Sequence, residues 1–464
     1  MCIHSKTKIC MTSNIIEGNP TKKFFIDMIT RDISIEDAII DLLDNSIDGA
    51  NRINPNDYSG LNIMLTVSQD CFEITDNCGG FSIDTAKKYA FRFGRPEDAP
   101  KGNGTVGRFG IGMKRSLFKI GKSFIVESKH KQDSFRVDVD VEEWSKKVRK
   151  ITNEDGSSDI IDDWSFSYIK LPQKDSGDGT SIIITNLNPE VSNLFGDESF
   201  LTTLADNIQK LLNFSLQKGL TISLNGKPLT SRRIELLLSD NTVPYHVEGV
   251  INNVKYKLVA GLGGVGEPKL SGWYIYCNNR LVLEADTSSI TGWGIQPIPK
   301  WHINYVMFRG ILFLDSNETL DLPLTTTKKG IDATSEVYKA LLPLMKNGML
   351  KVFEFLKKIP QMGDEANEYR TMLWENTPKI GAVELKAYIF PNTIKTFVAP
   401  PLDTDIIARK KSTIRIAYDV SKQIAEIAKD HAEAKSFKEL GETTFDYYLK
   451  LEELANEECD DIEL

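Results

Sequence analysis

The sequence predicts an α/β protein with an N-terminal α/β sandwich, a second α/β domain and a small α-rich C-terminal region. Helical and strand-like segments alternate over residues 20–360, which is typical of layered α/β domains. Hydrophobic residues make up 41% of the chain and charged residues 26%, and this composition excludes disordered and fibrous classes. The length of 464 residues fits about three domains. We expect them at residues 1–191, 192–360 and 361–464.

Nothing in the sequence indicates a secreted or membrane-bound protein. No run approaches the roughly 18 apolar residues of a membrane helix, and the first ten residues lack the apolar centre of a signal peptide. The six cysteines form no CxxC pair and no zinc-type spacing, so neither a disulfide framework nor a structural metal is indicated. We expect a cytoplasmic protein without a membrane partner.

Charge is distributed unevenly along the chain. The 56 Lys and Arg against 65 Asp and Glu give a net charge of −9, which argues against a wholly basic nucleic-acid coat. Residues 101–150 nevertheless hold 13 basic and 6 acidic residues, a local excess of +7. Residues 439–464 hold ten acidic residues and only Lys450 as a base, which is typical of a solvated end.

The first strong helical signal covers residues 34–51. Apolar residues recur there every three or four positions, and Ser34 is a natural N-cap. Asp41, Asn45 and Asp48 share the opposite face as one polar stripe. Taken alone, such a stripe more often faces solvent than a ligand.

Strand and loop signals follow this helix. Residues 61–75 are expected to form a hairpin that leads into a turn at residues 76–80. After a short helix, residues 94–112 are rich in glycine and contain two prolines. A loop of this length is usually a lid or a binding loop. A helix and further strands complete the first domain.

Three glycine patterns resemble known phosphate-binding motifs but lack the required context. Both GxGxxG matches, residues 102–107 and 261–266, fail because neither lies between a strand and a helix. Residues 107–114 miss the P-loop spacing by one residue. Glycine amides at the start of a helix are still a suitable cradle for phosphate.

The order of these motifs resembles that of the GHKL ATPases, a superfamily that includes gyrase, the ninety-kilodalton heat-shock chaperones, histidine kinases and MutL. The matching features are the polar helix stripe, the turn at residues 76–80, the glycine loop and Gly179–Thr180 at the start of a strand. The stretch GRFGIGMKRSLFKIGKSFIVESK is similar to the MORC (microrchidia) branch, where a lysine also follows the last glycine. The resemblance covers about residues 20–360.

This resemblance implies a site for ATP and Mg²⁺. Asn45, on the same stripe as Asp48, would bind Mg²⁺ through its side-chain oxygen, a ligand that suits a hard cation. Asp76 would accept a hydrogen bond from the adenine amino group, with support from Thr180. The other expected site residues would approach the base and the phosphates: Gly80, Gly107, Gly110, Gly112 and Lys114.

Two positions depart from the family pattern. Cys78 stands in the turn where the family has glycine, and we expect Gly79 to take the tight bend. Asp41 stands where the family usually carries glutamate as general base, and its side chain is one methylene shorter. A displacement of about an ångström can cost on the order of a hundredfold in rate. We therefore expect ATP binding, and slow hydrolysis with Asp41 as the base.

A second domain of the transducer type would return a lysine to the γ-phosphate. The loop at residues 322–332, LPLTTTKKGID, lies where that lysine is expected. We predict that Lys328 rather than Lys329 plays this role, and the alternative is a solvated basic turn. Lys328 would then couple the nucleotide state to the angle between domains.

The overall prediction is a homodimeric, ATP-gated clamp or switch of the MORC-like type. It would act on DNA or on a partner protein, in DNA processing or phage defence, with residues 361–464 as a partner or dimerisation region. The alternatives are a chaperone-like ATPase and a nucleotide sensor that does not hydrolyse ATP. A histidine kinase is disfavoured, because His4 is the only histidine before the helix at residues 34–51.

Overall fold

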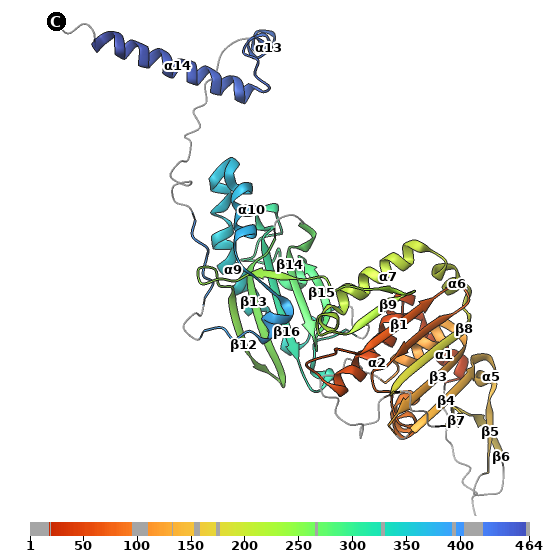
Figure 1. The fold of residues 1–464 in the computed structure, drawn as a ribbon. Helices are drawn as coiled ribbons and strands as arrows, with labels where there is room; N and C mark the ends of the chain where they lie inside the picture. Colours follow the sequence, from red (N-terminus) through yellow and green to blue (C-terminus); the bar gives the residue numbers. More distant parts are fainter. Residues whose placement is uncertain are drawn as a thin grey trace, which may run out of the picture. The chain divides into compact units, whose positions relative to one another are not determined.

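The computed structural model describes residues 18, 20–94, 110–131, 133–152, 158–172, 177–264, 268–325, 330–391, 396–402 and 421–460. The chain divides into two compact units, Met1–Leu402 and Asp403–Leu464. The larger unit contains two domains, each built on its own sheet, and the described part of the smaller unit is helical (Figure 1). The predicted α/β class is therefore confirmed.

Within the described residues, a mixed sheet of eight strands forms the N-terminal domain, in the order β10-β9-β1-β2-β8-β3-β4-β7. Side chains alternate between buried and more exposed along β1 and β2, so one face of the sheet packs against the core. A separate hairpin, β5–β6, extends from this domain. The strands are β1 (Asn62–Val67), β2 (Phe72–Asp76), β3 (Gly121–His130), β4 (Asp133–Asp140), β5 (Val148–Thr152), β6 (Ser158–Asp162), β7 (Tyr168–Lys170), β8 (Gly179–Leu187), β9 (Thr221–Leu224) and β10 (Lys227–Pro228).

Helices of the N-terminal domain share one hydrophobic core with this sheet. Leu43 of α2 and Leu117 of α4 lie in the same buried cluster as Phe72 of β2. Helix α2 begins where the sequence predicts, because Ser34 Oγ accepts a hydrogen bond from the Asp37 amide at 3.1 Å. The helices are α1 (Lys22–Arg31), α2 (Ile35–Ile53), α3 (Ile83–Thr85), the π-helix η1 (Ala86–Ala90), α4 (Gly112–Ile120), α5 (Val141–Lys146), α6 (Pro189–Phe195), α7 (Glu198–Leu211) and α8 (Asn213–Gln217).

The first sheet continues past residue 191, where the sequence predicts its domain to end. Strand β9 returns to pair in parallel with β1, with Thr221 opposite Asn62. Leu204 and Ile208 of α7 and Ile222 of β9 belong to the first core. The difference arises because a parallel pairing between segments this far apart leaves no local sequence pattern.

The second domain is built on a sheet that, among the described residues, has five strands in the order β12-β13-β16-β14-β15. Helix α9 packs on one face, against the Ala260 side of β13. The opposite face shares a core with Phe214 of α8 and Leu385 of α11. The elements are β12 (Tyr245–Ile251), β13 (Val254–Leu262), β14 (Gly272–Cys277), β15 (Arg280–Asp286), β16 (Phe308–Asp315), α9 (Glu336–Leu356), α10 (Ala366–Asn376), α11 (Ala382–Ala387), the small sheet β11 (Glu235–Leu237) with β17 (Lys379–Gly381), and the 3₁₀ turns η2 (Pro268–Leu270), η3 (Ser289–Thr291), η4 (Ile303–Tyr305), η5 (Thr319–Asp321) and η6 (Ile359–Glu365).

The C-terminal boundary also differs from the predicted residue 361. Strand β17 pairs with β11, and Ala382 and Leu385 are buried in the second core, so residues 366–387 belong to the second domain. The smaller unit contains α13 (Lys422–His431) and α14 (Phe437–Asp460), where the sequence predicts helices. Across the described residues, every helix is too short or too polar to cross a lipid bilayer.

Candidate nucleotide site

The central part of helix α2 is almost entirely buried. From Ala38 to Ala50, Asn45 is the only exposed residue. Asp41 and Asp48, predicted to share a stripe with Asn45, are only 6% and 8% exposed. An ordinary solvent-facing stripe would expose all three side chains. Between Ala38 and Ala50, the side-chain amide of Asn45 is therefore exposed to solvent while its neighbours are buried.

Asp76 is held at the end of β2 by groups from two directions. Its Oδ2 accepts a hydrogen bond from Ser46 Oγ of α2 at 2.6 Å. Its Oδ1 accepts from the amides of Cys78 at 2.8 Å and Thr180 at 3.3 Å. Burial raises the pKa of Asp76, and these three hydrogen bonds act in the opposite direction. Thr180 is the register partner of Asp76 across the β2–β8 pair, so the structure brings these two predicted residues together.

The turn after β2 depends on two glycines. Gly79 and Gly80 have φ angles of 91° and 56°, which favour glycine. A Cβ on Gly80 would also collide with the carbonyl oxygen of Lys129 on β3. Gly79 takes the bend as predicted, so Cys78 is accommodated without a left-handed backbone. Burial raises the pKa of the Cys78 thiol to about 12, which keeps it from acting as a thiolate ligand.

The start of α4 lies directly against α2. Gly110 has a φ of 66°, and a Cβ on Gly112 would lie 3.3 Å from Asp41 Oδ2. The lack of a side chain at Gly112 therefore permits the close approach of the two helices. The predicted site residue Gly107 lies outside the described residues.

Lys114 is 2% exposed and bonds to backbone groups on both sides of residues 95–109. Its ammonium donates to the carbonyl oxygens of Ala90, at 2.8 Å, and of Gly110. Burial lowers the pKa of Lys114 to about 7. The lysine predicted to face phosphate thus links the two ends of the glycine-rich segment.

The neighbouring residue, Arg115, is a site residue that the sequence analysis missed. Its Nη2 lies 2.6 Å from Asp41 Oδ2, and the two side chains are 15% and 6% exposed. Its Nε is buried and has no hydrogen-bond partner among the described residues. The side chains of adjacent helical residues point about 100° apart, so Lys114 and Arg115 cannot both face Asp41. The packing of α4 on α2 decides which of them does.

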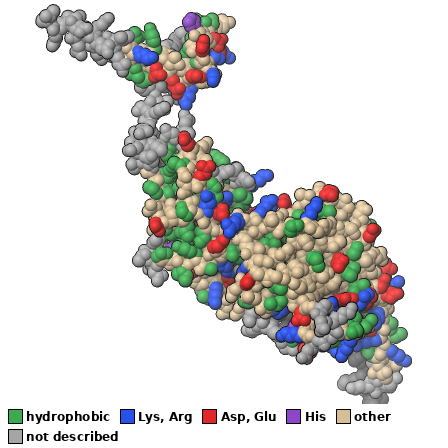
Figure 2. All heavy atoms as spheres, viewed as in Figure 1, with side chains coloured by type: hydrophobic (Ala, Val, Ile, Leu, Met, Phe, Trp, Pro, Cys, Tyr) green, Lys and Arg blue, Asp and Glu red, His purple; other side chains and the backbone are tan. Residues whose placement is uncertain are grey.

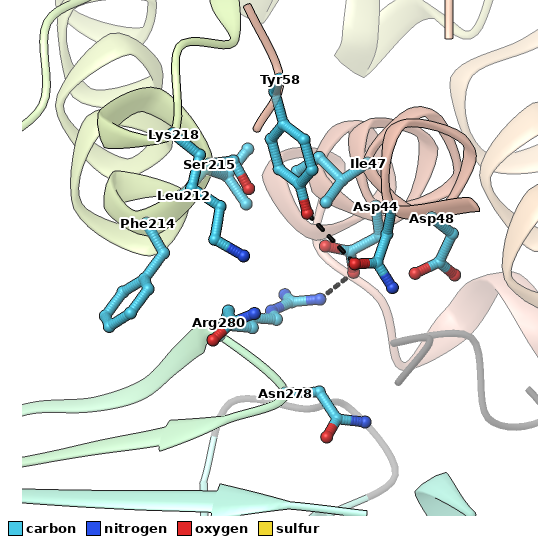
Figure 3. A pocket seen from close by; sticks show the side chains of 12 residues that line it. Asp44, Ile47, Asp48, Tyr58, Leu212, Phe214, Ser215, Lys218, Asn278 and Arg280 are labelled. Carbon is cyan, nitrogen blue, oxygen red and sulfur yellow. Dashed lines mark hydrogen bonds and ion pairs between the residues drawn. The ribbon is translucent and has the colours of Figure 1, made fainter. Parts of the chain in front are cut away.

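A second ion pair joins α2 to the other domain. Arg280, the first residue of β15, bonds through Nη1 to Asp44 Oδ2, and both side chains are at least 95% buried. Figure 3 shows Arg280 pointing from the second domain toward Asp44, with Tyr58 beside the pair. Burial, with nearby Asp48 and Cys78, raises the pKa of Tyr58 to about 12. The sequence carried no signal for a pair 236 residues apart.

Lys328 and Lys329 lie outside the described residues, but the ends of their loop are described. Leu324 and Ile331 form an antiparallel bridge, and the Thr325 amide donates to the Gly330 carbonyl at 3.1 Å. Of the rejected motifs, residues 102–107 also lie outside the described residues. Gly261 lies near the end of β13, and the chain continues to η2 and β14, which supports its exclusion as a dinucleotide site.

Comparison with known families gives a match within the N-terminal domain. Residues 33–167 match the family described as histidine kinase-, DNA gyrase B- and HSP90-like ATPase. The N-terminal domain is a GHKL-type ATPase domain. The matched segment contains α2, the β2 turn and α4, and it ends before Thr180. No curated protein matches the chain.

Proposed function

We propose that the protein binds ATP with Mg²⁺ at the face of α2 and hydrolyses it slowly, with Asp41 as the general base. The observation that carries this proposal is the single exposed amide of Asn45 on a buried helix, one turn after the carboxylate of Asp41. Asp76 supplies an acceptor for the adenine amino group, and the amides around it fix its orientation.

The residues present fit both ligands. Among the described residues, no cluster of three His, Cys, Asp or Glu could hold a metal ion by itself. A magnesium ion here would therefore rely on Asn45 together with phosphate oxygens, a combination that suits a hard cation. When bound, Mg²⁺ neutralises charge that develops on the phosphates. Gly80 and Gly112 leave room where a Cβ would meet protein atoms.

A second candidate function is a nucleotide sensor without turnover, and the Asp41–Arg115 pair favours it. A carboxylate held by a guanidinium at 2.6 Å must leave it before it can orient and deprotonate water. The shorter side chain of aspartate adds to this restraint. The two functions share the binding site and differ only in whether Asp41 is released.

We further propose that ATP closes two copies of the chain into a clamp or switch of the MORC-like type, with Lys328 sensing the γ-phosphate. The support is the similarity of the lid stretch to the MORC branch and the closed base of the loop at Thr325 and Gly330. DNA or a partner protein would be the cargo, in DNA processing or phage defence. In Figure 2 basic and acidic side chains intermingle on the visible face, which favours local rather than extended contact with DNA.

The test compares two substitutions on α2. Asn45→Ala should lose Mg²⁺-dependent ATP binding and keep its thermal stability, because the side chain is exposed. Asp41→Ala should bind ATP and lose turnover. Calorimetry with and without Mg²⁺ measures binding, and phosphate release measures turnover. Asn56→Ala, an exposed asparagine beyond the helix, is the control. Magnesium-dependent binding that survives Asn45→Ala would contradict the proposed site.

A further inference from the structure

The Asp44–Arg280 pair is placed next to the proposed catalytic residues. Asp44 immediately precedes Asn45 on α2, and Asp41 lies one turn earlier on the same helix. A helix behaves as a stiff element over so short a distance, because each turn is held by its own backbone hydrogen bonds. A shift of Asp44 is therefore a shift of Asn45 and Asp41 as well.

On the other side, Arg280 is firmly attached to the second sheet. It follows the tight turn Asn278–Asn279, in which both residues have positive φ. Lys386 of α11 donates to Asn279 Oδ1 at 2.6 Å and to Asp315 Oδ1 at 2.7 Å. Asn278 and Ser316 exchange hydrogen bonds of 3.0 and 3.1 Å. Arg280 is therefore held in a fixed position relative to β14, β15 and β16.

The chemistry of the pair is unlike that of a contact optimised only for stability. Buried ion pairs recover their desolvation cost only when every polar group is satisfied. Arg280 Nε is buried and has no hydrogen-bond partner among the described residues. A buried donor without a partner lowers the stability of the folded state. An ion pair that forms and breaks during function explains this arrangement better than a permanent structural contact.

We propose that Arg280 is a positioning residue of the ATP site, through which the second domain sets the alignment of α2. The inference rests on the proposed function, since it assigns the regulation of that same site. Arg115 holds α2 from the side of the glycine-rich segment, and Arg280 holds it from the second domain. ATP turnover then requires the ion pair between Arg280 of the second domain and Asp44. Nucleotide binding at Asp76 does not require it.

The experiment compares Arg280→Gln with Arg233→Gln in the full chain. Both substitutions replace an arginine with glutamine, but Arg233 is exposed beside β11 and pairs with Glu235 and Glu384. Arg280→Gln should lower kcat at least tenfold and change the dissociation constant for ADP less than threefold. Arg233→Gln should keep kcat within threefold. Amide exchange of α2 with a non-hydrolysable ATP analogue should increase in Arg280→Gln only.

Two further variants separate positioning from loss of fold. Arg280→Lys should recover part of the lost kcat, because it restores a charge opposite Asp44. The double variant Asp44→Asn with Arg280→Gln leaves no unpaired charge, so its Tm should return toward the native value while kcat stays low. Native kcat in Arg280→Gln, or full recovery of kcat in the neutral double variant, would overturn the proposal. Absence of ATP binding by the native chain would overturn the proposed function itself.

Discussion

The adenine end and the phosphate end of the proposed site are built in different ways. Asp76 is fixed by Ser46, Cys78 and Thr180, all within the N-terminal domain. Asp41 forms an ion pair with Arg115 of α4. The helix that carries Asp41 is also bound, through Asp44, by Arg280 of the second domain. In the proposed site, the part that would bind adenine is thus preformed, whereas the part that would bind the phosphates is assembled from separate segments. Such a division allows a protein to hold ATP while its turnover is regulated elsewhere.

The largest effect is expected at the preformed end. Asp76→Asn places an amide donor among groups that already donate, so ATP and ADP should both bind at least about a hundredfold more weakly. A buried donor left unsatisfied costs about 1–3 kcal/mol, so thermal unfolding should accompany the binding measurement. Glu73→Gln on the same strand is the control. An unchanged affinity would remove Asp76 from the site.

The assembled end should respond differently to ATP and ADP. Lys328→Ala should leave ADP affinity within about threefold of native. It should weaken dimerisation with a non-hydrolysable ATP analogue by about tenfold or more, because the terminal phosphate of the analogue is a suitable partner for the lysine ammonium. Sedimentation of the variant, with Lys329→Ala as the control, measures this. Equal dimerisation of Lys328→Ala and the native chain would make the loop an ordinary turn, and a defect confined to Lys329→Ala would identify the other lysine.

A substitution of Arg115 tests whether its ion pair with Asp41 slows ATP turnover. Arg115→Gln removes the group that holds Asp41, so turnover of the full chain should rise, by up to about tenfold if the restraint costs about 1.4 kcal/mol. Steady-state phosphate release with saturating ATP is the measurement, and Lys119→Gln on the same helix is the control. A fall in turnover would show instead that the guanidinium serves the reaction.

The last prediction concerns Lys114 and the pH dependence of stability, with no change expected in the reaction itself. Its pKa is about 7 in the folded chain against 10.5 for an unperturbed lysine, so above pH 7 the unfolded chain binds a proton that the folded chain lacks. Stability should therefore rise between pH 7 and pH 10, by about 2 kcal/mol from pH 7 to pH 9. Lys114→Met should flatten this rise in thermal unfolding, and Lys119→Met should keep it. Identical pH profiles for Lys114→Met and the native chain would contradict a neutral buried lysine.

Elements with a local signal were predictable from the sequence. The period of apolar residues and the cap at Ser34 placed α2 within two residues of its observed bounds. Two short β-rich runs predict the β1–β2 hairpin, and the glycines of the following turn, Gly79 and Gly80, are visible in the sequence. The order of motifs, rather than any single one, indicated that Asp76 and Thr180 belong together.

The residues that hold these groups in place were not predictable. Ser46 looks like any small polar residue in a helix, and its bond to Asp76 follows from how α2 packs on β2. Arg115 and Lys114 are both cations after a glycine, and the rotation of α4 on α2 decides their partners. Arg280 meets Asp44 only after two domains have folded and docked. Each of these contacts depends on tertiary packing, which one sequence does not encode locally.

The return of β9 to β1 has a consequence for how the chain is made. The open edge of β1 is covered only when residues 221–224 are available, so a ribosome must synthesise all of α6, α7 and α8 before the N-terminal sheet can close. A fragment cut at residue 191 would present β1 as a bare edge, the type of surface that draws other chains into unwanted pairing. The smallest piece expected to stay in solution as an independent N-terminal domain therefore extends to about residue 229, where the Leu229 amide still donates to the Ile222 carbonyl.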